Sequence, residues 1–177
     1  MATEQSTKWN PRGERIVMPQ DAAFSANQMV DIAIRTEQAG YAFYQAAVEA
    51  TDSPQVRALC EWLAEEEEDH ERVFQKMKEN LGPQELPEEW PGEKIEFIDA
   101  LVGSRFLPKP QEAEALVKDL SARGILDFAL NFEKDTTIFF YEMRDMVPAS
   151  AVDQVNGIIA EEKAHVTHIL KAKAALE

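Results

Sequence analysis

The sequence predicts an all-α protein: a bundle of four long helices, arranged as two antiparallel hairpins that a long crossover segment joins. The composition is rich in Ala, Glu and Leu and has only seven glycines in 177 residues, which favours helices. Apolar residues recur at alternating steps of four and three along four segments, as they do on the buried seam of a packed helix. Two short hairpin loops and one long connection are a recognised topology for such bundles.

The first hairpin is expected to consist of helices over about 25–50 and 53–80. Ser25 followed by Gln28 has the spacing of a capping box, which starts the first helix. The second helix starts with a serine followed by Pro54, a favourable residue at the first helical position, and a Gly-Pro pair follows its end.

The second hairpin is expected to repeat the first. A third helix is expected over roughly 121–146, ending before Pro148, and a fourth from after Ser150 nearly to the C-terminus. The stretch "DIAIRTEQAGYAFY" (31–44) aligns with "DFALNFEKDTTIFF" at an offset of 96 residues, and "LAEEEEDH" (63–70) aligns with "IIAEEKAH" at an offset of 95. Two matches in the same order indicate a duplication.

Two segments fall outside these helices. Residues 1–20 are polar and show no period, so we expect an extended or disordered N-terminal arm there. The crossover, 83–120, is rich in proline and is expected to hold one or two short helices near 93–102 and 111–119. The bundle domain is therefore expected over 21–177.

Charge and composition exclude several classes of function. The formal net charge of −15 disfavours nucleic acids and anionic membrane surfaces as partners. The single cysteine, Cys60, excludes an internal disulfide framework and any Cys-x-x-Cys metal knuckle. We expect no signal peptide and no membrane span, because no stretch is long and apolar enough. A cytoplasmic location is the resulting expectation.

Each long helix carries acidic or histidine residues on its apolar seam. The stretch "AEEEEDH" (64–70) has the composition of a solvated helix face, but Glu67 and His70 fall on the seam. The fourth helix repeats this pattern with Glu162 and His165. The first and third helices each have one acidic residue on the seam. An ionised carboxylate in an apolar interior is costly unless it is paired or bound to a metal. The six polar seam residues are Glu37, Glu67, His70, Glu133, Glu162 and His165.

Simple geometry predicts that these residues meet. Residues equidistant from the turn of an antiparallel hairpin lie at the same height. The midpoint of Glu37 and Glu67 is residue 52, and that of Glu133 and Glu162 lies between residues 147 and 148, so both fall in predicted turns. Each pair then lies about 22 Å from its turn. If the hairpins pack with their turns in register, all four carboxylates converge at the middle of the bundle.

Four carboxylates and two imidazoles suit a pair of divalent first-row metal ions, with iron or manganese favoured over zinc. Two dications neutralise four carboxylates, which removes the cost of burying them. One Glu from each of two helices, plus Glu-x-x-His from each of two others, is the arrangement of di-iron and di-manganese carboxylate bundles. Two metals about 3.5–4 Å apart can bind O2 or peroxide and supply two electrons together.

On these motifs the chain resembles the ferritin-like superfamily and, within it, the rubrerythrin-like di-iron carboxylate proteins. The resemblance covers about 25–80 and 121–175, and it rests on two Glu-x-x-His motifs, each 29–30 residues after an upstream Glu. It implies that the six polar seam residues bind two iron ions, with Glu67 and Glu162 bridging. The chain lacks the paired Cys-x-x-Cys motifs of a rubredoxin module, and it has Thr136 where some relatives carry a second glutamate.

Further residues are candidates for contacts around the ligands. Asp31 and Asp127 each precede a seam glutamate by six residues, and either could orient a ligand imidazole through Nδ1; the alternative is a surface salt bridge. Tyr44 is a candidate hydrogen-bond donor or electron carrier, with core packing as the alternative. Glu66 and Glu161, directly beside the seam, are candidates for contact with the ligands, the alternative being full solvation.

The expected function is redox chemistry on O2 or H2O2, either peroxide reduction or ferroxidation of Fe(II), with an external electron donor. A homodimer is the expected assembly. Two alternatives stay open: a di-manganese catalase, which disproportionates peroxide without a reductant, and a non-enzymatic iron-binding or storage protein. The metal present and the need for a reductant distinguish them.

Overall fold

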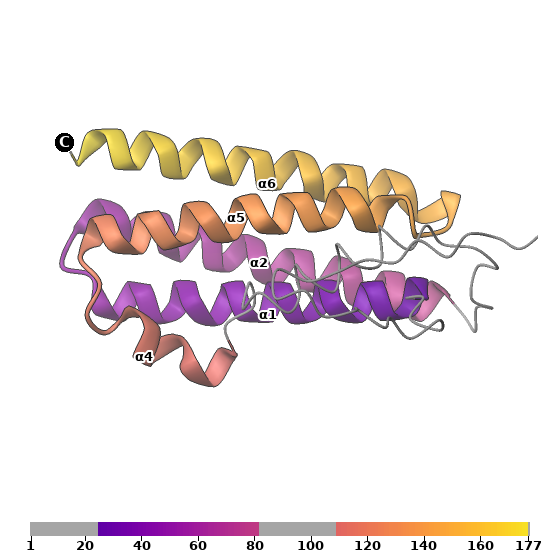
Figure 1. The fold of residues 1–177 in the computed structure, drawn as a ribbon, viewed down its shortest axis with the longest axis horizontal. Helices are drawn as coiled ribbons and strands as arrows, with labels where there is room; N and C mark the ends of the chain where they lie inside the picture. The colour runs from indigo at the N-terminus through magenta and orange to yellow at the C-terminus, as the bar shows by residue number, and fades with distance from the viewer. Residues whose placement is uncertain (1–24, 82–108, 177) are drawn as a thin grey trace, which may run out of the picture.

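Four long α-helices lie side by side in the computed structural model of the protein, which describes residues 25–81 and 109–176 (Figure 1). No strand is present in these two ranges, which confirms the all-α prediction. None of their helices is long and apolar enough to cross a membrane. The elements in chain order are α1 (Ala26–Ala50), α2 (Pro54–Leu81), the 3-10 turn η1 (Pro110–Glu112), α4 (Ala113–Val117), α5 (Ala122–Arg144) and α6 (Ala149–Ala175).

The helix starts are fixed by the caps that the sequence predicts. At α1 the side chain of Ser25 accepts a hydrogen bond from the Gln28 N–H at 3.2 Å, and the Gln28 side chain accepts one from the Ser25 N–H at 2.8 Å. At α5 the Ser121 side chain accepts from the Gly124 N–H at 3.1 Å. These bonds satisfy backbone donors that have no partner inside the helix.

The turn between α5 and α6 differs slightly from the prediction. Helix α5 ends at Arg144, two residues before the expected Met146, and α6 already begins at Ala149. Pro148 explains both differences. It disfavours helical backbone at the residue before it, and its own extended ψ places it at the N-cap of α6.

The crossover is described only in its last part. There η1 and α4 correspond to the short helix expected near 111–119, and they pack against α1. The short helix expected near 93–102, the N-terminal arm 1–20 and most of the crossover lie outside the described residues.

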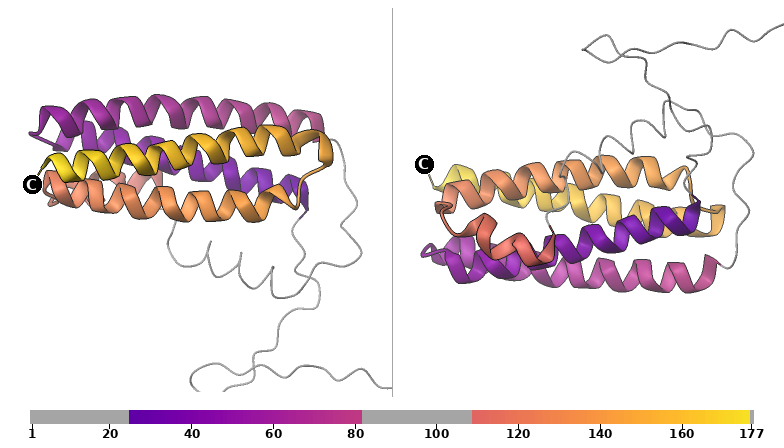
Figure 2. Two further views of the ribbon diagram at one scale, coloured as in Figure 1. Left: turned by 90° about the horizontal axis from the view of Figure 1, so that it is seen from above. Right: turned by 60° about the horizontal axis from the view of Figure 1, so that its bottom comes forward.

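The two hairpins pack with their turns at opposite ends of the bundle, as Figures 1 and 2 show. Helix α1 is the neighbour of α5, and α2 is the neighbour of α6. One apolar cluster joins the start of α1 and the end of α2 to the α5–α6 turn. The other joins the α1–α2 turn region to the start of α5 and the end of α6. The in-register arrangement assumed above is therefore wrong.

The polar seam residues nevertheless lie level, because each is at the middle of its helix. Glu37 is near the centre of α1, and the three other seam glutamates are equally central in α2, α5 and α6. Turning one hairpin end for end does not move such a residue along the bundle axis. The apolar clusters fill the space above and below this level, with buried aromatic pairs such as Phe74 and Phe140, whose ring centroids lie 5.1 Å apart.

Candidate metal centre

All six polar seam residues are buried at the middle of the bundle, with exposed fractions of at most 2%. Glu37 comes from α1 and Glu133 from α5. Helices α2 and α6 each supply a glutamate and, one turn later, a histidine on the same face. The structure thus brings together every residue that the sequence places on the polar seam.

These residues form two overlapping groups of potential ligands. Within each group the donor atoms lie within 4.8 Å of one another; the groups are Glu37, Glu67 and His70, and Glu67, Glu133 and His165. Glu67 belongs to both groups. Glu162 also reaches both imidazoles, since its Oε1 lies 3.0 Å from Nδ1 of His70 and its Oε2 lies 3.7 Å from Nδ1 of His165. Glu67 and Glu162 are thus the two carboxylates with contacts to both groups.

Most polar atoms of this centre lack a hydrogen-bond partner. Among the described residues, every buried side-chain N or O atom without a partner belongs to these six residues, with the single exception of Oγ1 of Thr136. The 3.0 Å contact between His70 and Glu162 does not have hydrogen-bond geometry. Buried polar atoms are almost always paired, so a cluster of unpaired donor atoms of this chemistry fits two divalent cations.

The far nitrogens of the two imidazoles face carboxylates from the opposite hairpin. Glu161 of α6 has its Oε2 3.0 Å from Nε2 of His70, which is on α2. Glu66 of α2 has its Oε2 3.8 Å from Nε2 of His165, which is on α6. A carboxylate at Nε2 holds a proton there and leaves the Nδ1 lone pair free for a metal. Glu161 is therefore placed to orient His70, whereas Glu66 faces His165 at a distance too long for a hydrogen bond.

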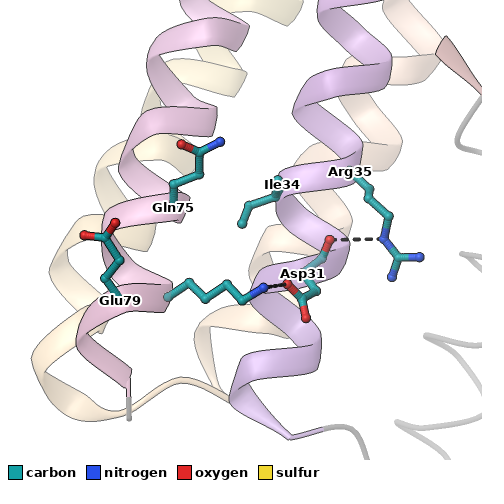
Figure 3. A pocket seen from close by; sticks show the side chains of 6 residues that line it. Asp31, Ile34, Arg35, Gln75 and Glu79 are labelled. Carbon is teal, nitrogen blue, oxygen red and sulfur yellow. Dashed lines mark hydrogen bonds and ion pairs between the residues drawn. The ribbon is translucent and has the colours of Figure 1, made fainter.

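Of the two interpretations of Asp31 and Asp127, the structure supports the surface salt bridge and not the orientation of the imidazoles. Asp31 forms an ion pair with Lys78 at the surface of the α1–α2 hairpin, in the groove of Figure 3. Asp127 forms an ion pair with Lys173 of α6, which lowers the pKa of its carboxyl. At 3.6 residues per turn, a spacing of six residues rotates a side chain by about 240° from the seam. The aspartates consequently lie on other faces of their helices than the seam glutamates.

Tyr44 lies beside the centre, as one of its sequence interpretations requires. It is fully buried in α1, and its hydroxyl donates a hydrogen bond to Oε1 of Glu133 across the α1–α5 contact. Burial raises the pKa of the Tyr44 hydroxyl well above its usual value, and the charge of Glu133 adds to this. The hydroxyl therefore stays protonated and serves as a donor to Glu133.

Burial also makes the metal-free centre hold protons. It raises the pKa of Glu37 and Glu67 well above the ordinary value and that of Glu133 to about 8. Burial lowers the pKa of the two imidazoles, but the neighbouring glutamates outweigh this and raise it to about 9 for His70 and about 10 for His165. For Glu162 the imidazole contacts outweigh burial and lower the pKa.

Metal loading at neutral pH is therefore expected to release protons. Groups with a pKa above 7 carry protons in the metal-free protein, and a cation binds only after they leave. The affinity for Co(II) should rise as the pH is raised from 6 to 8. Anaerobic titration with Co(II) in weak buffer with a pH indicator measures both effects. Full loading without acidification would contradict the expected protonation of the centre.

Gly40 of α1 borders the centre. A Cβ atom placed on Gly40 would lie 2.7 Å from Cδ and 2.8 and 2.9 Å from the two carboxyl oxygens of Glu67. These distances are shorter than any ordinary contact. The absence of a side chain at position 40 is what allows the Glu67 carboxylate to lie where it does.

Thr136 aligns with Gly40 at the repeat offset of 96 residues, and the sequence singles it out only as a departure from some relatives. It is fully buried, and its hydroxyl has no partner. Helical threonines usually donate to the carbonyl four residues earlier, and Thr36, Thr137 and Thr167 all do so here. The Thr136 hydroxyl is therefore available to a partner that the protein itself does not provide.

Comparison with known proteins agrees with this geometry. The sequence model of the family described as Rubrerythrin matches residues 28–173, a range that includes all six buried residues. Among solved structures, a proposed ferritin-like diiron-carboxylate protein from Thermotoga maritima is similar, with 25% sequence identity and a TM-score of 0.65. The similarity covers 89% of this chain and 100% of that one. No match was found among the curated proteins.

Proposed function

The chain belongs to the Rubrerythrin family, and from this premise we propose that it is a di-iron oxidoreductase that reduces H2O2 or O2. The observation that carries the proposal is the pair of ligand groups that share Glu67. Shared carboxylates hold two metal ions close enough to act on one small oxygen substrate. The similar Thermotoga maritima protein, described as a diiron-carboxylate protein, favours iron over manganese.

In this proposal each metal has one glutamate and one histidine of its own. Glu37 and His70 would hold the first ion, and Glu133 and His165 the second. Glu67 and Glu162 would lie between the ions and bind both. Four carboxylates balance the charge of two dications, so the loaded centre is neutral and compatible with its apolar surroundings.

Reduction of H2O2 to two waters takes two electrons and two protons, and an iron pair held by these residues would supply the electrons. In this proposal an external donor returns them; the chain's single cysteine does not form the paired Cys-x-x-Cys motifs of a rubredoxin module. The protein's own side chains exclude water and direct hydrogen bonds. The apolar clusters cover both ends of the site, and the Tyr44 hydroxyl fixes the position of Glu133.

The proposal is tested by mixing anaerobically loaded Fe(II) protein separately with H2O2 and O2. Oxidation of Fe(II) should be much faster than that of free Fe(II) in the same buffer. Peroxide consumption that continues only with added reductant would identify a peroxidase, and a faster reaction with O2 than with H2O2 a ferroxidase. Sustained consumption by the manganese form without reductant would identify a catalase instead. Oxidation no faster than in buffer would leave a non-enzymatic iron-binding protein.

Replacing Thr136 with valine is expected to slow the reaction with the oxidant about tenfold while both metals still bind. In the proposal its unpaired hydroxyl donates to the oxygen substrate, and a lost hydrogen bond of about 1.4 kcal/mol corresponds to that factor. Stability should not fall, because no internal hydrogen bond is removed. Thr36→Val is the matched control, since Thr36 is equally buried but its hydroxyl is already bonded to the Ile32 carbonyl. Equal rates in both variants would contradict this role for Thr136.

A further inference from the structure

A surface cavity lies over the centre on its α2–α6 side. Its volume is about 430 Å³, and its lining includes Glu66, Asp69 and Glu161 together with the imidazole of His70. Asp69 forms an ion pair with Arg72 at 2.6 Å. The other charged groups of the lining are Lys76 and the carboxylates of Glu66 and Glu161, whose side chains are 31% and 55% exposed. The cavity thus joins solvent to an imidazole of the buried centre.

An unpaired nitrogen of the centre faces one of these carboxylates, that of Glu66. His165 is 1% exposed, and its Nε2 has no hydrogen-bond partner. The nearest carboxylate oxygen is Oε2 of Glu66 at 3.8 Å, which is too long for a hydrogen bond. Two ligand atoms at this separation can each lie about 2.0–2.2 Å from a single ion between them. Donor atoms of Glu66, His70 and His165 also form a group within 4.8 Å.

We propose that Glu66, Glu161 and Nε2 of His165 form a capture site for a divalent cation on its way to the buried centre. The inference rests on the proposed di-metal centre, whose six ligands are almost inaccessible to solvent. Any ion that fills the centre must first leave water. The carboxylates of Glu66 and Glu161 at the mouth of the cavity replace part of the ion's hydration shell. The His165 imidazole is then the next ligand on the way to the buried centre.

The chemistry of imidazole makes this site transient. A neutral imidazole offers one lone pair, and the other nitrogen carries the proton. When Nδ1 of His165 binds a metal in the centre, its Nε2 carries the proton and can donate to Glu66. When Nε2 binds an ion in the capture site, it first gives up the proton that it carries in the metal-free protein, and Nδ1 keeps its own. The capture site therefore empties as the centre fills, and a loaded protein retains two ions.

The test is the rate of Co(II) uptake by the metal-free, full-length protein. In the double variant Glu66→Gln/Glu161→Gln, each amide oxygen can still accept from Nε2–H, but both negative charges are gone. We expect uptake and release to slow together by at least tenfold, with two ions still bound. The matched control is Glu61→Gln/Glu65→Gln, which removes two charges from the exposed face of α2. This control should leave the uptake and release rates within twofold of those of the wild type.

The other outcomes separate this inference from the proposed centre. Unchanged uptake in the Glu66/Glu161 variant would overturn the capture site. A Kd weakened in proportion to the uptake rate, with release unchanged, would do the same and would make these residues part of the equilibrium binding site. A wild-type protein that binds no Co(II) would instead overturn the centre itself.

Discussion

Replacing Glu67 with methionine is expected to make the metal-free protein more stable and, at the same time, unable to bind two metals. Glu67 is fully buried with two unpaired oxygens beside three other carboxylates. A buried polar group without a hydrogen-bond partner costs about 1–3 kcal/mol, and an apolar side chain of similar volume avoids that cost. Because the Glu67 carboxylate belongs to both ligand groups, its loss should remove the stabilisation that metal gives the wild type.

Urea denaturation of both proteins, with and without Fe(II) or Co(II), measures these effects. The control is Glu65→Met, which changes an exposed residue of the same helix and should alter stability by no more than about 0.5 kcal/mol. A Glu67→Met protein that is less stable without metal, yet still gains stability from it, would show that Glu67 belongs to the core and not to a metal centre.

Gly40→Ala is expected to reduce the number of bound metals from two to one or fewer while the fold is retained. In most helices this change is favourable by about 1 kcal/mol. Here the added methyl group would lie within 3 Å of the Glu67 carboxyl group. The carboxyl group is the flexible end of the Glu67 side chain, but it is fully buried. It can avoid the added methyl group only by leaving its position between the two ligand groups.

The chain supplies a matched control for this change. Gly157 is also helical, and a Cβ there would meet nothing within 4 Å. Gly157→Ala should therefore stabilise the protein by about 0.5–1 kcal/mol and leave the metal content unchanged. Elemental analysis of both variants measures the number of metal ions bound per chain. Two metals bound by Gly40→Ala with wild-type affinity would contradict the assigned position of Glu67.

The sequence predicts the helices and the buried polar residues well because both depend on local periodicity. The acidic run 64–70 is the best example. The seam separates Glu67 and His70, which are buried, from Glu65 and Glu68, which are exposed. The repeat in α6 shows the same division at Glu162 and His165. Burial of this set follows from the 3.6-residue period and needs no knowledge of the tertiary fold.

Relations between the hairpins could not be predicted in the same way. Periodicity does not fix which end of one hairpin lies beside which end of the other. Packing with the turns in register could therefore be stated only as a condition, and the turns in fact lie at opposite ends of the bundle. The same limit explains the imidazole partners. Glu66 and Glu161 each reach the histidine of the other hairpin, and only the packing of α2 on α6 creates these contacts. The aligned Glu-Glu doublets in the two repeats were the available signal.

The central claim is that each chain holds two metal ions at the buried glutamates and histidines. Its most direct test is anaerobic titration of the metal-free protein with Fe(II), followed by elemental analysis of the protein after removal of unbound metal. We expect two ions per chain in the wild type and fewer in Glu67→Met. Fewer than one ion per wild-type chain, or a content that Glu67→Met leaves unchanged, would contradict the claim.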